Sequence, residues 1–161
     1  MQNPEDHEPC PHCGRFKNRG VSIDAVILRN NKVLLIKRRN SPFKGMWALP
    51  GGYVEFNENA NETIKREVKE ETNLDVVTSE LSDVYTDPKR DPRSTISLAY
   101  VVKATGNTKP GDDASEVEWF KLDKLPKLAF DHEQIITECT SQLLILFRSC
   151  FLLLPILYLH H

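Results

Sequence analysis

The sequence has few of the features that mark secreted or nucleic-acid-binding proteins. It contains 4 cysteines in 161 residues, and their spacing does not match the disulfide framework of a small secreted domain. The formal net charge is −2, so there is no basic excess, and we expect no nucleic-acid partner. The N-terminal residues are polar and acidic, unlike a signal peptide. These absences predict a cytoplasmic protein.

Two segments at the ends of the chain differ from the rest. Residues 1–19 have no apolar period and contain Cys10 and Cys13 in a CPHC motif. A structural zinc site takes four ligands, and no second CxxC follows. We therefore expect free thiols here rather than Zn²⁺; the alternative is a zinc site completed across a homodimer.

The C-terminal tail, residues 143–161, is almost entirely apolar. A membrane-spanning helix takes about 20 such residues, and this run is shorter. Arg148 and Pro155 also interrupt it, and a central arginine opposes insertion. We therefore expect no membrane insertion, with a tail anchor as one alternative. A buried C-terminal helix, a dimer surface and a shifted reading frame remain as alternatives.

The middle of the chain, residues 20–142, has the length and composition of one globular domain. Runs rich in Val and Ile, bounded by turn residues, predict strands at 21–28, 33–37, 81–85, 95–104 and 117–122. Residues 41–49 are predicted to form a loop, and a last helix is predicted near Asp131. Strands before and after a central helix indicate an α+β fold.

The central helix is predicted over residues 59–72. Asn59 and Glu62 have the spacing of a capping box, in which each side chain accepts a hydrogen bond from the other's backbone. Asn73 fits the left-handed residue that ends many helices, where Gly is best and Asn next.

Three glutamates on this helix depart from a simple amphipathic pattern. Ile64 and Val68 form the apolar stripe, yet Glu67 and Glu71 project toward that side, with Glu70 on the flank. Like charges three and four residues apart repel, and a buried carboxylate is unfavourable unless it is paired. Convergent carboxylates would suit a hard divalent cation. The alternative is an ordinary helix end with solvated glutamates.

The spacing of the charged residues favours the metal-binding interpretation. It follows the pattern G-x5-E-x7-R-E-U-x-E-E, where U is aliphatic, at Gly52, Glu58, Arg66, Glu67, Glu70 and Glu71. Such a match arises by chance at about 10⁻⁷ per start position. The pattern resembles the Nudix box, in which Gly stands at the position of Asn73. Residues 47–52, 116–120 and 128–132 also resemble family segments, so the resemblance covers about residues 19–140.

The resemblance implies an α/β/α sandwich, with a mixed sheet between helices, and hydrolysis of a pyrophosphate bond in a nucleoside diphosphate derivative. It implies Mg²⁺ as cofactor, with Mn²⁺ as an alternative. The implied ligands are Glu67, Glu70, Glu71, the Gly52 carbonyl and, as a distal carboxylate, Glu116. Glu70 is either a ligand or the base that activates water, and Glu58 and Arg66 orient the cluster.

The loop at residues 85–93 resembles that of prokaryotic ADP-ribose pyrophosphatases, which release AMP and ribose-5-phosphate. Ser94 and Thr95 depart from the expected small residue and His. The predicted substrate-binding residues are Arg38, Arg39, Lys89, Arg90 and Arg93. Alternatives are a triphosphate pyrophosphohydrolase acting on oxidised dGTP and a non-catalytic nucleotide-sensing module.

Overall fold

The computed structural model of the chain describes Gly14, residues 18–111 and residues 114–152. Cys10 and Cys13, with the zinc question that they raise, lie outside these described residues, as do residues 153–161 of the tail. The elements in chain order are β1 (Val21–Arg29), β2 (Lys32–Arg38), β3 (Trp47–Ala48), α1 (Ala60–Thr72), β4 (Asp75–Tyr85), β5 (Ile96–Thr105), β6 (Ala114–Lys121) and α2 (His132–Leu152).

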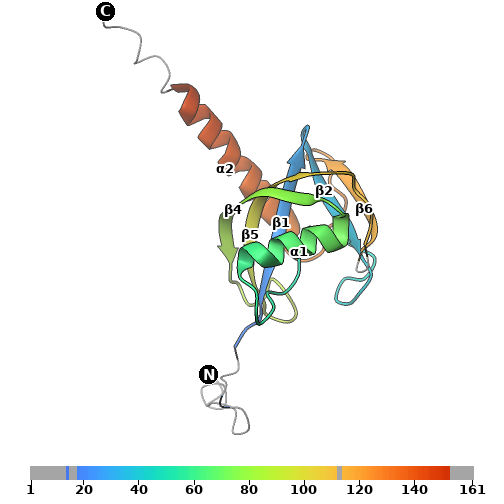
Figure 1. The fold of residues 1–161 in the computed structure, drawn as a ribbon. Helices are drawn as coiled ribbons and strands as arrows, with labels where there is room; N and C mark the ends of the chain where they lie inside the picture. Colours follow the sequence, from blue (N-terminus) through green and yellow to red (C-terminus); the bar gives the residue numbers. More distant parts are fainter. Residues whose placement is uncertain (1–13, 15–17, 112–113, 153–161) are drawn as a thin grey trace, which may run out of the picture.

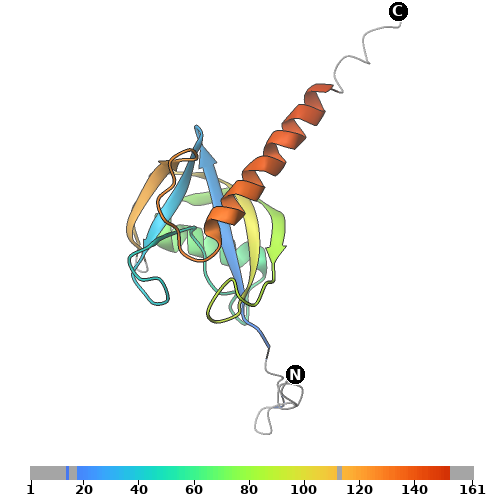
Figure 2. The same ribbon diagram turned by 180° about the vertical axis from the view of Figure 1, so that it is seen from behind.

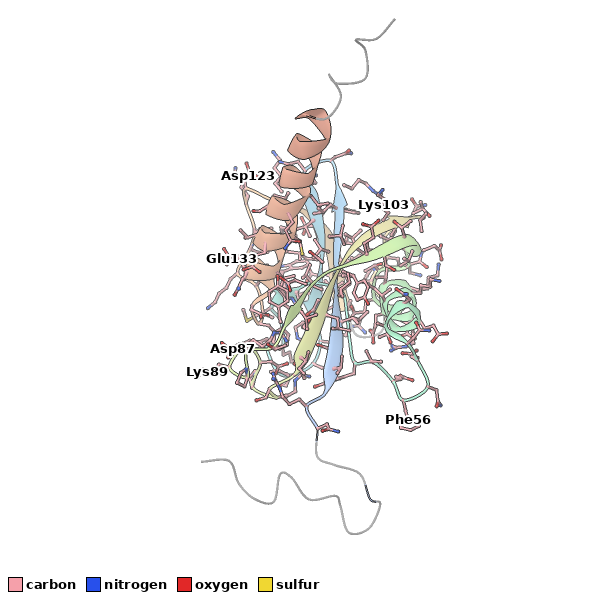
Figure 3. The ribbon with its side chains drawn as sticks, turned by 90° about the vertical axis from the view of Figure 1, so that its left-hand side faces the viewer. Phe56, Asp87, Lys89, Lys103, Asp123 and Glu133 are labelled. Carbon is pink, nitrogen blue, oxygen red and sulfur yellow. The ribbon has the colours of Figure 1, made fainter. Side chains whose placement is uncertain are left out.

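The strands form one mixed sheet that lies between two helices, as the α+β prediction required. The strand order is β3-β2-β1-β5-β4, and β6 pairs with β2. β1 and β5 are parallel, whereas the other pairs are antiparallel. α1 covers one face and α2 the other, which the front and back views show (Figures 1 and 2) and the side view shows edge-on (Figure 3).

Alternation along β1 fills both faces of the sheet. Ile23 and Ile27 point toward α1 and pack in one cluster with Ile64, while Val26 points the other way and packs with Ile135 of α2. All five side chains are essentially inaccessible to solvent. Because successive strand residues point to opposite faces, a continuous apolar run gives a strand that is buried on both sides.

The caps of α1 are confirmed. The Asn59 side chain accepts hydrogen bonds from the backbone N–H groups of Asn61 and Glu62, and the Glu62 carboxylate accepts one from the Asn59 N–H at 2.8 Å. Asn73 has a left-handed backbone with φ of 62°, and its N–H donates to the Lys69 carbonyl. The sequence signals at both ends of α1 are therefore local, and they are sufficient to predict where the helix begins and ends.

Three strands differ from their predicted bounds. β4 begins at residue 75 rather than 81, and its register against β5 shifts at two points, between Val76 and Thr78 and between Leu81 and Asp83. Such bulges interrupt the period-two pattern, which is why the first half of β4 is not visible in the sequence. β3 lies inside the predicted loop at 41–49, and β6 begins at residue 114 rather than 117.

α2 begins at His132, next to the predicted start, and runs through residue 143 to Leu152 without interruption. It therefore includes the first part of the apolar tail, and its C-terminal portion extends beyond the sheet (Figure 2). Among the described residues, no helix combines the length and apolar character needed to cross a bilayer.

Candidate active site

A cavity of about 450 Å³ opens beside the C-terminal half of α1. Its lining comes from β1, the end of β2, residues 49–55, α1, the loop after β4 and the start of α2. We call the three helix carboxylates that line it, Glu67, Glu70 and Glu71, the acidic wall. We call the arginines that line it outside α1, Arg38, Arg39, Arg90 and Arg93, the basic wall.

The acidic wall lies directly against a pair of glycines. Glu71 is 6% exposed, and its carboxylate accepts a hydrogen bond from the Gly51 N–H at 2.9 Å. The Glu67 carboxylate occupies the space that a Cβ on Gly52 would fill. The Gly52 carbonyl accepts the Ile23 N–H at 2.9 Å, which leaves its second lone pair available to another partner. The glycines therefore let backbone and carboxylate oxygens approach one another closely.

Arg66 holds the carboxylates together. Its guanidinium donates to both oxygens of Glu58 at 2.6 and 2.9 Å, to Glu67 at 2.7 Å and to Glu70 at 3.3 Å. The hydrogen bonds from Arg66, with a smaller one from Thr63, lower the pKa of Glu58 to about 2. The same bonds raise the pKa of Arg66. Both groups therefore stay charged across the physiological range.

The donor set of the acidic wall fits a hard divalent cation, which prefers carboxylate and carbonyl oxygens. Within the part of the chain that the structure describes, no three His, Cys, Asp or Glu side chains already converge as a coordination sphere. Arg66 instead bridges Glu67 and Glu70. The Gly52 backbone lies against the same carboxylates, because the Glu67 carboxylate takes the space that a side chain at Gly52 would fill.

Arg38 and Arg93 line the same cavity. Burial and the charge of Arg93 lower the pKa of Arg38. Hydrogen bonds to Asp91 hold Arg93 in place and raise its pKa. The Arg93 guanidinium also lies over the Tyr53 ring, at 5.2 Å from its centroid. Since Arg38 and Arg93 destabilise each other's charge, an anion bound between them would relieve that repulsion.

Arg90 also lines the cavity, but its guanidinium is already paired with carboxylates of the protein. Its side chain is 4% exposed and makes a two-pronged ion pair with Asp131, at 2.8 and 2.6 Å. Its guanidinium also lies 3.6 Å from Asp24 and donates to Thr95. Two carboxylates therefore neutralise this arginine before any ligand is bound.

Two predicted site residues lie away from the cavity. Lys89 is exposed and projects outward beside Asp87 (Figure 3), and it is not among the lining residues that the structure describes. Glu116 also lies outside that lining, and it pairs with Lys37 at 2.9 Å on the sheet surface. The other predicted residues line the cavity, except Glu58, which reaches it through Arg66.

Sequence reasoning missed two polar residues on the cavity floor, Asp24 and His132. Burial acts to raise the pKa of Asp24, but His132, the Ser97 hydroxyl and the charge of Arg90 outweigh it and lower that pKa. His132 is 3% exposed and accepts a hydrogen bond from the Leu49 N–H at 2.8 Å. The sequence signal for Asp24 was its position as a single carboxylate inside the apolar run of β1.

The helix–sheet–helix sandwich and the glutamate-lined cavity define a known class of hydrolase. Residues 18–139 match the model of the NUDIX domain, and the chain belongs to the Nudix family, whose hydrolases generally use a divalent metal ion. It is 52% identical, over 76% of its length and 74% of the relative, to an ADP-ribose pyrophosphatase of Methanocaldococcus jannaschii. The resemblance predicted from the box is therefore confirmed.

Two further relatives are connected with the same nucleotide. The chain is 30% identical to the ADPR responsive transcriptional repressor NtrR of Acinetobacter baylyi, over 76% of this chain and 52% of that one. It is also similar to the NUDIX domain of Shewanella oneidensis NrtR, solved in complex with ADP ribose. That match has a TM-score of 0.73 and 29% identity, and covers 83% of this chain and 93% of the other.

Proposed function

We propose that this chain hydrolyses the pyrophosphate bond of ADP-ribose, with Mg²⁺ as cofactor, and releases AMP and ribose-5-phosphate. One observation carries the proposal: the acidic wall and the basic wall line a single cavity. A diphosphate between a divalent cation and arginines has its charge compensated from both sides. The name of the M. jannaschii relative and the nucleotide bound to the S. oneidensis NrtR domain support the choice of ADP-ribose.

The acidic wall would hold the metal. Glu67, Glu71 and the Gly52 carbonyl would be its ligands, with Mn²⁺ as an alternative ion. When bound, Mg²⁺ supplies neutralisation of phosphate charge and a lower pKa for water. Arg66 already contacts Glu67 and Glu70, so it would keep these carboxylates from repelling one another before the cation arrives.

Proton transfer falls to the most accessible of the three carboxylates. The Glu70 side chain is 58% exposed, compared with 13% for Glu67, so water reaches Glu70 more easily. Glu70 would accept a proton from the attacking water, while Glu58 stays ionised and anchors Arg66. A base must lie within hydrogen-bond reach of the proton it removes, and Glu70 lines the cavity in which the attacking water would lie.

In the basic wall, Arg38 and Arg93 would bind the phosphate oxygens. Both guanidinium groups line the cavity, and Arg39 lies beside them. Planar guanidinium groups bind phosphate through paired hydrogen bonds. Because Arg90 is already paired with Asp131 and Asp24, it would hold the loop in place rather than bind phosphate.

A sensing function without catalysis is the second candidate, because NtrR is named as an ADPR responsive repressor. The two functions differ in one measurable property. A sensor binds ADP-ribose and leaves it intact, whereas a hydrolase converts it to two monophosphates. Chromatography of ADP-ribose after incubation with the chain and Mg²⁺ separates these outcomes.

The decisive experiment is a hydrolysis panel with ADP-ribose, NADH, oxidised dGTP and diadenosine polyphosphates. We expect AMP and ribose-5-phosphate from ADP-ribose, loss of turnover with EDTA, and recovery with added Mg²⁺. Glu71→Gln should lower kcat by about 10³-fold, the equivalent of about 4 kcal/mol. Glu80→Gln on the exposed side of β4 is the matched control. Equal and negligible turnover by wild type and Glu71→Gln would refute hydrolysis, and preference for oxidised dGTP would refute the substrate.

A further inference from the structure

Three consecutive residues at the start of α2 each contact a different part of the cavity. Phe130 lies against the guanidinium groups of the basic wall, Asp131 binds Arg90, and His132 binds the segment that leads into Gly52. We propose that this FDH triplet is a set of positioning residues: Phe130 and Asp131 govern substrate binding, and His132 governs turnover. The proposal rests on the hydrolysis proposed above.

His132 connects α2 to the glycine segment. Its Nδ1 accepts the Leu49 N–H at 2.8 Å, so the proton of the neutral ring lies on Nε2, which faces Asp24 at 3.3 Å. Two residues after Leu49, the Gly51 N–H donates to Glu71 at 2.9 Å. His132 therefore fixes the backbone from which Glu71 of the acidic wall receives its hydrogen bond.

Asp131 acts on the loop after β4. Its carboxylate holds Arg90 by two hydrogen bonds inside the protein, where Asp24 provides a second negative charge. The next residue, Asp91, is 3% exposed and binds the Arg93 guanidinium at 2.9 and 3.1 Å. Arg90 is thus the inward anchor of the loop and Arg93 its cavity-facing cation. Without Asp131, the anchor would lose its main partner and Arg93 its fixed position.

Phe130 contacts two of the cations that line the cavity. Arg38 lies 5.0 Å from its ring centroid and Arg93 lies 5.6 Å from it, while the Phe43 ring packs edge-on at 4.8 Å. Phe130 also has φ of 53°, which is uncommon for a bulky side chain and unfavourable. Such strain persists where surrounding contacts enforce it, and here the contacts place an aromatic ring against two guanidinium groups.

Steady-state kinetics with ADP-ribose and Mg²⁺ test the division of roles. Phe130→Leu removes the aromatic face, and we expect KM to rise about tenfold with kcat within about twofold, as the loss of two cation–π contacts implies. Asp131→Asn should raise KM by a similar factor. His132→Leu should lower kcat by about 10- to 100-fold, as loss of a supporting hydrogen bond does, and leave KM within about threefold.

Conservative variants separate positioning from general loss of structure. Phe130→Tyr keeps the ring, Asp131→Glu keeps the charge, and His132→Asn keeps an acceptor near the position of Nδ1 for the Leu49 N–H. Each should recover most of the affected constant, with thermal unfolding measured for every variant. The proposal is wrong if the three disruptive variants change KM and kcat in equal proportion, or if the conservative variants fail to restore the affected constant.

The two proposals fail in distinguishable ways. If hydrolysis is the wrong function, the wild-type chain leaves every substrate of the panel intact. If the positioning roles are wrong, the wild-type chain hydrolyses ADP-ribose, but Phe130→Leu and His132→Leu show no separation between KM and kcat.

Discussion

The acidic and basic walls face the same cavity, but they are built in different ways. The acidic wall comes from one turn of α1, residues 67–71, and from the glycines that lie against it. The basic wall takes Arg38 from the end of β2 and Arg93 from the loop after β4, and Phe130, just before α2, contacts both. A wall built from one helix depends on local spacing, whereas a wall built from three segments depends on how the whole domain packs.

The largest expected effect is on the acidic wall. Gly52→Ala adds a Cβ where the Glu67 carboxylate lies, so either the backbone or the carboxylate must move. We expect kcat to fall by about 10²-fold, since displacement of a group by about 1 Å can have that effect on a site. Calorimetric titration with Mg²⁺ should show weaker binding, and thermal unfolding without metal should change much less. An unchanged kcat at saturating Mg²⁺ would contradict the close approach seen at Gly52.

A smaller effect is expected on the basic wall. Arg93→Ala removes one of the two cations that face the cavity, and we expect KM for ADP-ribose to rise about 10- to 100-fold, since a charged hydrogen bond contributes about 1.5–3 kcal/mol. Lys65→Ala removes a positive charge from the exposed side of α1 and is the control. If Lys65→Ala raises KM as much as Arg93→Ala, the effect belongs to overall charge and not to the wall.

The same contrast explains what the sequence could predict. The box, the capping box at Asn59 and the left-handed stop at Asn73 depend on residues in one continuous stretch of chain, α1 and the segment that leads into it, so spacing alone was sufficient. The hydrogen bond between Leu49 and His132 joins residues 83 positions apart, and no local pattern reports such a contact. The sequence also does not distinguish two roles for Arg90. A basic residue in a loop gives the same sequence signal whether it binds phosphate or, as here, pairs with Asp131.

The free energy of unfolding should depend on pH in the acid range through Asp91, the carboxylate that binds Arg93 of the basic wall. Burial acts to raise the pKa of Asp91, but hydrogen bonds from Arg93 and Thr95 outweigh it and lower the pKa from 3.8 to about 2. A lowered pKa stabilises the fold above 3.8, and that contribution is lost as the pH falls through about 2. We expect Asp91→Asn to have a lower free energy of unfolding at pH 7 and a weaker pH dependence between these values.

Denaturant titrations of wild type and Asp91→Asn at several pH values measure this difference directly. Because other carboxylates, including Glu58, titrate in both proteins, the difference between the two curves isolates Asp91. Parallel curves would mean that Asp91 has the same pKa in the folded and unfolded states. The basic wall would then not depend on this carboxylate for its stability.

The smallest effect is expected at the one position where the chain departs from the box. Asn73→Gly restores the family residue and relieves the left-handed backbone at φ of 62°, a gain of about 0.5–1 kcal/mol. It also removes the hydrogen bond from the Asn73 side chain to the Asn107 carbonyl, a loss of about 0.5–1.5 kcal/mol. Since the two nearly cancel, thermal unfolding should shift little and kcat should not change. A large fall in kcat would mean that Asn73 supports the acidic wall directly, beyond its role in ending α1.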